Sequence, residues 1–153
     1  MTRQSVKLLR SSPEIRGFIK GFEALRLKAY RDQKGVLTIG WGHTRDVHEG
    51  QVITRTQAED LLRQDVYVAE GTLRLGVKVP LFQREYDALL SFVFNVGGGN
   101  FAKSTMRELL NELRYEDAAD QFPRWVYSGR EKSNGLIRRR DAERRIFLTG
   151  LYA

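Results

Sequence analysis

Three polar residues in the first quarter of the sequence have types and spacing that could support acid–base chemistry. Glu23, Asp32 and Thr38 are separated by eight and five residues. Two carboxyl groups in different environments can act as an acid and a base, because one keeps its proton while the other is ionised. The elements predicted around them must position these three side chains.

Glu23 closes a predicted helix. Ser12 and Pro13 are typical of a helix start, and an apolar stripe at helical spacing follows and ends near Glu23. Glu23 lies at the edge of this stripe, beside Ile19, and at the negative end of the helix dipole. Both features disfavour a carboxylate and favour the protonated form, which suits a general acid. The stripe consists of Ile15, Phe18, Ile19 and Phe22.

Asp32 and Thr38 fall in a predicted β-hairpin, with strands at 27–30 and 36–41 joined by the turn residues 31–35. A turn keeps the Asp32 carboxylate hydrated or bonded to backbone N–H groups, and hence ionised. Thr38 shares a strand face with Gly40 and Gly42, so we expect a cleft floor that a bulky ligand can approach.

Each of these residues also has an ordinary structural interpretation. A glutamate near a helix end is usually solvated, Asp32 with Gly35 is typical of a type I turn, and threonine is common in strands. His43, near the end of the hairpin, is typical of a structural partner for a carboxylate such as Asp65.

The rest of the chain is predicted to be mostly helical. Thr54 and Gln57 form a capping box for a long helix at 54–78, and 81–96 is nearly apolar all round and should be buried. Gly97 to Gly99 should end that helix. We expect further helices from Ser104, at 116–126 and at 136–148, with β structure confined to the segment before Thr54.

This order of elements indicates a single α+β domain over residues 1–153. We expect a small lobe at about 13–53, the long helix as a link, and a helical lobe at about 80–153.

Composition excludes several classes of site. The 153 residues contain no cysteine and only two histidines, which rules out a cysteine nucleophile, a thiolate metal site and a multi-histidine metal site. We expect neither metal nor cofactor. The longest apolar stretch, 88–96, is too short to span a membrane, and we expect no stable membrane insertion.

The charge balance favours anionic partners. Lys and Arg number 26 against 19 Asp and Glu, for a net charge of +7. Nucleic acid, acidic lipid and acidic envelope polymers all fit that charge. We interpret the basic run near the C-terminus as a solvated face with Arg139/Glu143 and Asp141/Arg145 pairs.

The segments Gly21-Phe22-Glu23, Tyr30-Arg31-Asp32 and Leu37-Thr38-Ile39-Gly40-Trp41-Gly42-His43 together resemble the active-site region of phage-type lysozymes, the endolysins of glycoside hydrolase family 24. The resemblance continues through Phe94-Asn95-Val96-Gly97 and Arg124-Trp125-Val126 to Arg139. It implies a lysozyme-like fold and cleavage between N-acetylmuramic acid and N-acetylglucosamine in bacterial peptidoglycan, for host cell lysis.

The resemblance also implies roles for individual residues. Glu23 would be the general acid, while Asp32 and Thr38 would serve the attacking water, with anomeric inversion and carboxyl groups about 6.5–9.5 Å apart. It suggests substrate contacts at Gly42, Phe94, Ser104 and Gln121. For the last three, a core residue, a helix cap and a surface residue are the structural alternatives.

Some members of this family begin with an apolar anchor, which this sequence lacks. The resemblance is therefore to the kind that waits in the host cytoplasm until a separate holin releases it to the periplasmic cell wall. We expect a monomer.

Three other functions stay open. A lytic transglycosylase of the same fold needs the acid but no aspartate-held water, so the presence of Asp32 and Thr38 argues against it. A non-catalytic cationic protein could bind the envelope or disrupt membranes through the arginines of the last helix. A nucleic-acid module fits only the charge, because no nucleic-acid motif is present and the aromatic residues follow core spacing; we therefore expect no nucleic-acid partner.

Overall fold

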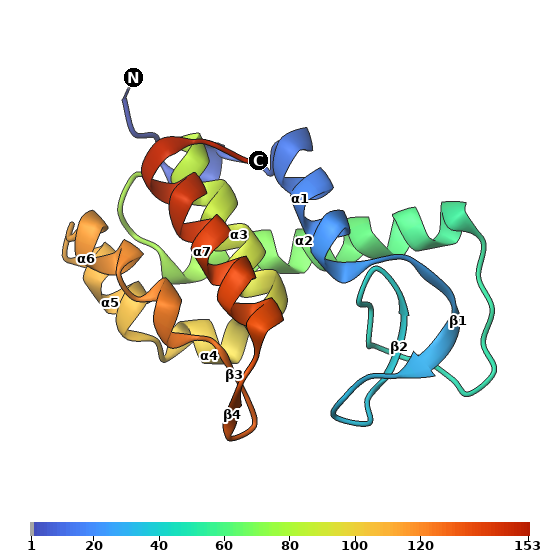
Figure 1. Ribbon diagram of the computed structural model, residues 1–153. Helices are drawn as coiled ribbons and strands as arrows, with labels where there is room; N and C mark the ends of the chain where they lie inside the picture. The colour runs from blue at the N-terminus through green and yellow to red at the C-terminus, as the bar shows by residue number, and fades with distance from the viewer. Residues whose placement is uncertain (1) are drawn as a thin grey trace.

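The computed structural model describes residues 2–153 as two lobes joined by one long helix (Figure 1). Helix α2 (Arg55–Gly76) runs from the small lobe to the helical lobe, and the small lobe carries the hairpin of β1 (Arg26–Arg31) and β2 (Leu37–Gly40). The α+β, mostly helical and lysozyme-like fold is confirmed. The lobe boundaries themselves stay a prediction. Within residues 2–153, no helix has both the length and the apolar character needed to cross a bilayer.

The first helix forms as its sequence predicts. Helix α1 (Pro13–Glu23) is capped by the Ser12 side chain, which accepts a hydrogen bond from the Ile15 N–H. Ile15 and Ile19 are fully buried, so the apolar stripe holds the helix against the core. Ala24 then leaves the helical region at φ 52°, which makes Glu23 the last helical residue.

The N-terminal end of α1 is fastened to the helical lobe. The backbone N–H of Ser11 donates to Glu70 on α2 at 2.8 Å. The hydroxyl groups of Ser12 and of Tyr152, near the C-terminus, both donate to Asp87, which is fully buried. The helix that carries Glu23 is thus tied at its far end to two helices and to the end of the chain. Before α1, the short 3₁₀ helix η1 (Val6–Leu8) and Gln4, which pairs with Leu81, lie against the helical lobe.

The helical lobe is built around α3 (Gln83–Val96) and α7 (Asn134–Thr149), which pack side by side (Figure 1). Phe92 on α3 contacts the rings of Phe101, Phe122 and Trp125 edge to face, and this aromatic cluster supports Trp125 from behind. The remaining helices are α4 (Gly98–Ala102), α5 (Thr105–Asn111), α6 (Tyr115–Ala119) and the 3₁₀ helix η2 (Phe122–Arg124).

Two sequence predictions for this lobe are wrong. The helix expected at 116–126 ends at Ala119 and is followed by a separate 3₁₀ turn, because Pro123 has no N–H to continue an α-helix. The expectation that the glycines end the buried helix is confirmed, since α3 stops at Val96 and Gly97 caps it, and α4 begins immediately afterwards.

The expectation that β structure ends before Thr54 is also wrong, since β3 (Tyr127–Ser128) and β4 (Glu131–Lys132) form a second hairpin. The last helix begins two residues earlier than expected.

Candidate active site

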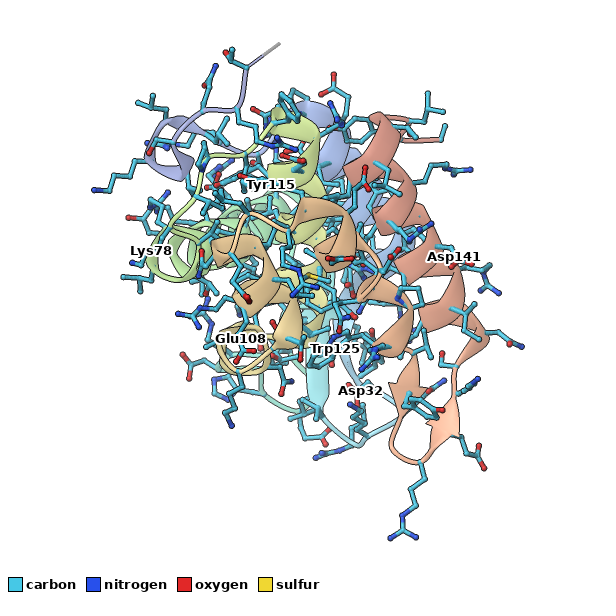
Figure 2. All side chains as sticks on the ribbon, turned by 90° about the vertical axis from the view of Figure 1, so that its left-hand side faces the viewer. Asp32, Lys78, Glu108, Tyr115, Trp125 and Asp141 are labelled. Carbon is cyan, nitrogen blue, oxygen red and sulfur yellow. The ribbon has the colours of Figure 1, made fainter. Side chains whose placement is uncertain are left out.

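A cleft of about 800 Å³ lies between the two lobes. The small lobe contributes Glu23 at the end of α1 and Asp32 at the β1–β2 turn. The helical lobe contributes Trp125 and the hairpin residue Tyr127. Figure 2 shows Asp32 and Trp125 on the same side of the molecule. The structure therefore brings the two predicted carboxyl groups to one cleft, although they belong to different elements.

Glu23 is half-buried, with 18% of its side chain exposed, and it has a cationic partner that the sequence analysis missed. The Nη1 atom of Arg139 donates to its Oε2 at 2.6 Å. Gly42 passes close on the other side at φ 76°, where an added Cβ would lie 2.5 Å from Glu23 Oε1. The carboxyl group is thus held between an arginine of α7 and the backbone that follows β2.

Asp32 has the environment that its turn predicts. Its Oδ1 atom accepts hydrogen bonds from the backbone N–H groups of Lys34, at 2.8 Å, and Val36, at 2.9 Å. These two bonds use one carboxylate oxygen. Within residues 2–153, Oδ2 has no hydrogen-bond partner, so it is available to a ligand or to water.

Thr38 lies behind the cleft wall. It pairs across the hairpin with Tyr30, which lines the cleft, but Thr38 itself is only 4% exposed. Its hydroxyl donates to the Val36 carbonyl at 2.9 Å. The oxygen keeps acceptor capacity, and any direct contact with the cleft requires a small local movement.

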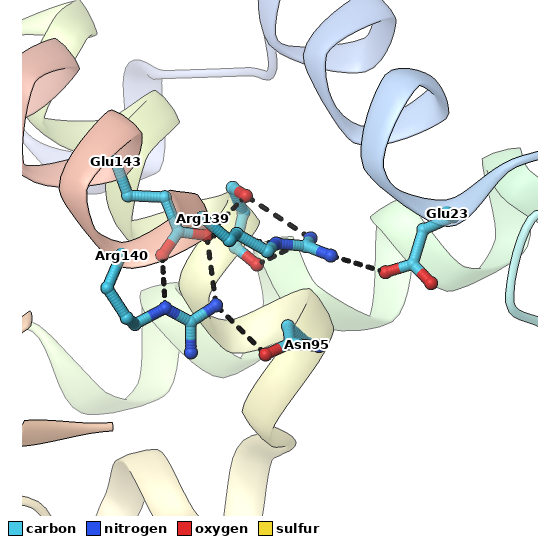
Figure 3. Close-up of polar contacts among 6 residues, drawn as sticks. Glu23, Asn95, Arg139, Arg140 and Glu143 are labelled. Atoms are coloured by element: carbon cyan, nitrogen blue, oxygen red, sulfur yellow. Dashed lines mark hydrogen bonds and ion pairs between the residues drawn. The ribbon is translucent and has the colours of Figure 1, made fainter. Parts of the chain in front are cut away.

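Arg139 belongs to a buried charge cluster, shown in Figure 3, that consists of Arg139, Arg140, Glu143, Ser91 and Asn95. Arg139 and Arg140 are 3% and 0% exposed, and Glu143 is fully buried. Arg140 Nε lies 2.7 Å from Glu143 Oε1, and Arg140 Nη2 donates to Asn95 at 2.9 Å.

Burial raises the pKa of Glu143, while Arg140 and Arg139 act against that rise. Burial likewise lowers the pKa of Arg140.

The interpretation of the basic run as a solvated face is therefore wrong for these arginines. The predicted Arg139/Glu143 pair forms, but it forms in the interior. The described side chains of Asp141 and Arg145 form no ion pair. A signal was present in the sequence, because Arg139, Arg140 and Glu143 share helical spacing with the buried Ile146 and Phe147.

The four predicted substrate contacts are spread over several places. Gly42 and Phe94 line a groove of about 280 Å³. Gln121 is half-buried just before η2. Ser104 is 4% exposed, and its hydroxyl donates to the Phe101 carbonyl and caps α5 by accepting from the Arg107 N–H.

His43 has the structural role expected from the sequence. Its Nδ1 lies 2.8 Å from Asp65 on α2, and its Nε2 lies 2.8 Å from the Arg45 carbonyl. Across residues 2–153, no group of three or more histidine or carboxyl side chains is placed to hold a metal ion.

Comparison with known proteins identifies the family of this chain. The family model for phage lysozyme matches residues 20–143. This chain belongs to the phage lysozyme family. It is accordingly a glycoside hydrolase of the lysozyme type.

Individual relatives extend the match. The endolysin of Acyrthosiphon pisum secondary endosymbiont phage 1 is 44% identical over 84% of this chain and 91% of its own length. The SAR-endolysin of Bacteriophage PS119 is 38% identical over 85% of this chain and 78% of its own length. By contrast, the chain spans about half the length of the Bacillus phage endolysins that it matches.

The endolysin from Escherichia coli O157:H7 phage FAHEc1 has a solved structure that superposes with a TM-score of 0.86 at 32% identity, covering 99% of both chains. The agreement extends over the whole two-lobed fold.

Proposed function

We propose that this chain is a muramidase that uses Glu23 as general acid and Asp32, with Thr38, to position and activate the attacking water. As a phage lysozyme the chain is a peptidoglycan-hydrolysing endolysin, and the proposed bond is that between N-acetylmuramic acid and N-acetylglucosamine. The observation that carries the proposal is that Glu23, at the end of α1, and Asp32, at the β1–β2 turn, line the same cleft.

The two carboxyl groups have different polar partners. Asp32 receives two backbone N–H groups, which stabilise a carboxylate and leave Oδ2 free to accept a hydrogen bond from water. Glu23 is half-buried and held in place by its contact with Arg139. A protonated Glu23 would donate to the glycosidic oxygen, and water held at Asp32 would attack the opposite face of the sugar with inversion.

The role of Glu23 is tested by Glu23→Gln, with Glu14→Gln on the same helix as a matched control. We expect the first variant to release no reducing ends from purified peptidoglycan and the second to match the wild type. If Glu23→Gln still hydrolyses the wall, Glu23 is not the acid.

The role of Asp32 is tested by mass spectrometry of the muropeptides released by wild type and by Asp32→Asn. We expect reducing N-acetylmuramic acid ends from wild type and almost none from the variant. Products with 1,6-anhydro ends would instead identify a transglycosylase. Lysis of cells without any released muropeptides would support the cationic membrane-disrupting function.

Substrate contacts at Gly42, Phe94, Ser104 and Gln121 remain part of the proposal. Ser104 gives the sharpest test, because both hydrogen bonds of its hydroxyl already go to backbone groups. A raised KM for Ser104→Ala would support a contact with substrate. A lower unfolding free energy with unchanged KM would limit Ser104 to capping α5.

We further propose that the enzyme waits in the host cytoplasm as a monomer and depends on a holin for release. The support is the family resemblance of the sequence. Expression in a bacterial host with and without a co-expressed holin tests it. Lysis that needs the holin is expected, whereas lysis by the chain alone would show independent export, and sedimentation velocity would give the oligomeric state.

A further inference from the structure

Glu143 is a charged side chain that the proposed reaction does not use. It is fully buried, and a single residue, Arg139, links it to the acid Glu23. We propose that Glu143 is a positioning residue, which holds Arg139 against Glu23 and offsets the positive charge around the acid. This inference rests on the function proposed above. Glu143 does not line the cleft, so it would act on the acid through the two arginines that it contacts and not by touching substrate.

The geometry fixes the Arg139 guanidinium on three sides (Figure 3). Its Nε donates to Glu143 Oε2 at 3.3 Å, and its Nη2 donates to the carbonyl and hydroxyl oxygens of Ser91, both at 3.3 Å. The remaining Nη1 donates to Glu23 Oε2 at 2.6 Å. A planar guanidinium that is held by two of its nitrogens has little freedom at the third, so Glu143 and Ser91 together aim Nη1 at the acid.

The charges around Glu23 indicate a second effect of Glu143, in addition to holding Arg139 in place. Glu23 faces two guanidinium groups on α7, because Arg140 lies beside Arg139 and lines the same cleft. Glu143 contacts both arginines and accepts a hydrogen bond from the Ser91 hydroxyl at 2.5 Å, so the polar groups that it contacts are hydrogen-bond donors. A carboxylate there balances one of the two positive charges. Without it, the pair of arginines would stabilise the ionised form of Glu23 and oppose its use as an acid.

Other charged groups face this region from neighbouring elements, but most of them are exposed or already paired. The exposed ones are screened by solvent, and their effect on a buried pair is therefore smaller. The groups that line the same cleft are Asp32 and Lys34 on the β1–β2 turn, Arg124 on η2 and Arg138 on α7. On the elements packed against α1 and α7, Asp120 after α6 is paired with Arg144, Lys20 on α1 is paired with Glu59, and Arg84 on α3 donates to the Phe147 carbonyl.

The experiment compares Glu143→Gln, which removes the charge and keeps the shape, with Asp141→Asn. Asp141 is an exposed carboxylate on the same helix and projects away from the molecule (Figure 2), so it is a matched control. Two readouts are used: the pH dependence of kcat/KM for release of reducing ends from peptidoglycan, and the titration of the Glu23 carboxyl carbon by NMR. The second readout needs no activity.

For Glu143→Gln we expect the alkaline limb of the profile and the Glu23 titration midpoint both to move down by about one pH unit. Above that limb, kcat should fall about tenfold while KM is unchanged, because the acid and not substrate binding is altered. Asp141→Asn should match wild type. Glu143→Asp keeps the charge and should restore the wild-type midpoint.

The inference is overturned if folded Glu143→Gln keeps the wild-type limb and midpoint, or if Asp141→Asn moves them equally. If Glu143→Gln does not fold, Ser91→Ala replaces it. Losing that hydroxyl donor disfavours the charged form of Glu143 and should move the midpoint in the same direction. If wild type releases no reducing ends, the proposed function fails, while the NMR midpoint still decides the role of Glu143.

Discussion

Gly42→Ala should disable the active site while the fold survives. Gly42 has φ 76°, and a Cβ there would lie 2.5 Å from Glu23 Oε1. The backbone conformation alone should cost about 1–2 kcal/mol for alanine. The steric conflict falls on the end of a flexible side chain, so the Glu23 carboxyl group would move away and lose its 2.6 Å contact with Arg139. A displacement of about 1 Å at a reacting group costs about a hundredfold in rate.

The Gly50→Ala variant is a control that separates the effect of backbone strain at positive φ from the effect of the steric conflict with Glu23. Gly50 has the same φ of 76° as Gly42, but nothing lies within 4 Å of its added Cβ. Thermal unfolding should show that both variants lose stability similarly, with Tm lower by about 2–8 °C. Release of reducing ends from peptidoglycan should fall about a hundredfold for Gly42→Ala only. Equal activity of the two variants would refute the reasoning that Gly42 makes room for the Glu23 carboxyl group.

Three further predictions concern stability. Asp65→Ala should lower the unfolding free energy in denaturant by about 1–3 kcal/mol, because it removes the hydrogen-bond partner of a His43 side chain that is only 8% exposed; an unchanged midpoint would contradict this. Burial raises the pKa of the Tyr86 hydroxyl above 10, so unfolding releases its proton above that pH. Between about pH 10.5 and 12, the unfolding free energy of the wild type should therefore fall with pH more steeply than that of Tyr86→Phe, by about 1.4 kcal/mol per pH unit. Parallel plots of unfolding free energy against pH for the two proteins would rule this out. Phe92→Ala should cost about 3–5 kcal/mol, since Phe92 is fully buried among three aromatic rings, and a loss below 1 kcal/mol would show that the cluster closes around the gap.

The small lobe was predictable because its signals are local. The cap at Ser12, the stripe that ends at Glu23 and the turn around Asp32 each depend on residues a few positions apart. The capping box of Thr54 and Gln57 likewise begins α2 where the sequence indicates. Local hydrogen bonds and helical spacing decide these elements, and tertiary contacts do not override them.

The sequence predictions that are wrong concern features that depend on tertiary contacts or on a single helix-breaking proline. Pro123 divides the segment expected to be a single helix, and the two-residue strands of the β3–β4 hairpin are too short to show alternation. The contact between Glu23 and Arg139 spans 116 residues, and no local pattern contains it. Arginine is seldom buried unless it is paired, so a run of arginines such as the one containing Arg139 predicts a surface position.

Both lobes contribute groups that surround the Glu23 carboxyl group. Glu23 belongs to α1, whereas Arg139 belongs to α7, so the contact between them depends on how the helices sit relative to each other. Two sets of contacts hold that arrangement: the hydrogen bonds from Ser12 and Tyr152 to the buried Asp87, and the packing of α7 on α3. Substitutions at these distant places should therefore affect the acid through its distance to Arg139. A loss of activity there is not evidence that the substituted residue touches substrate.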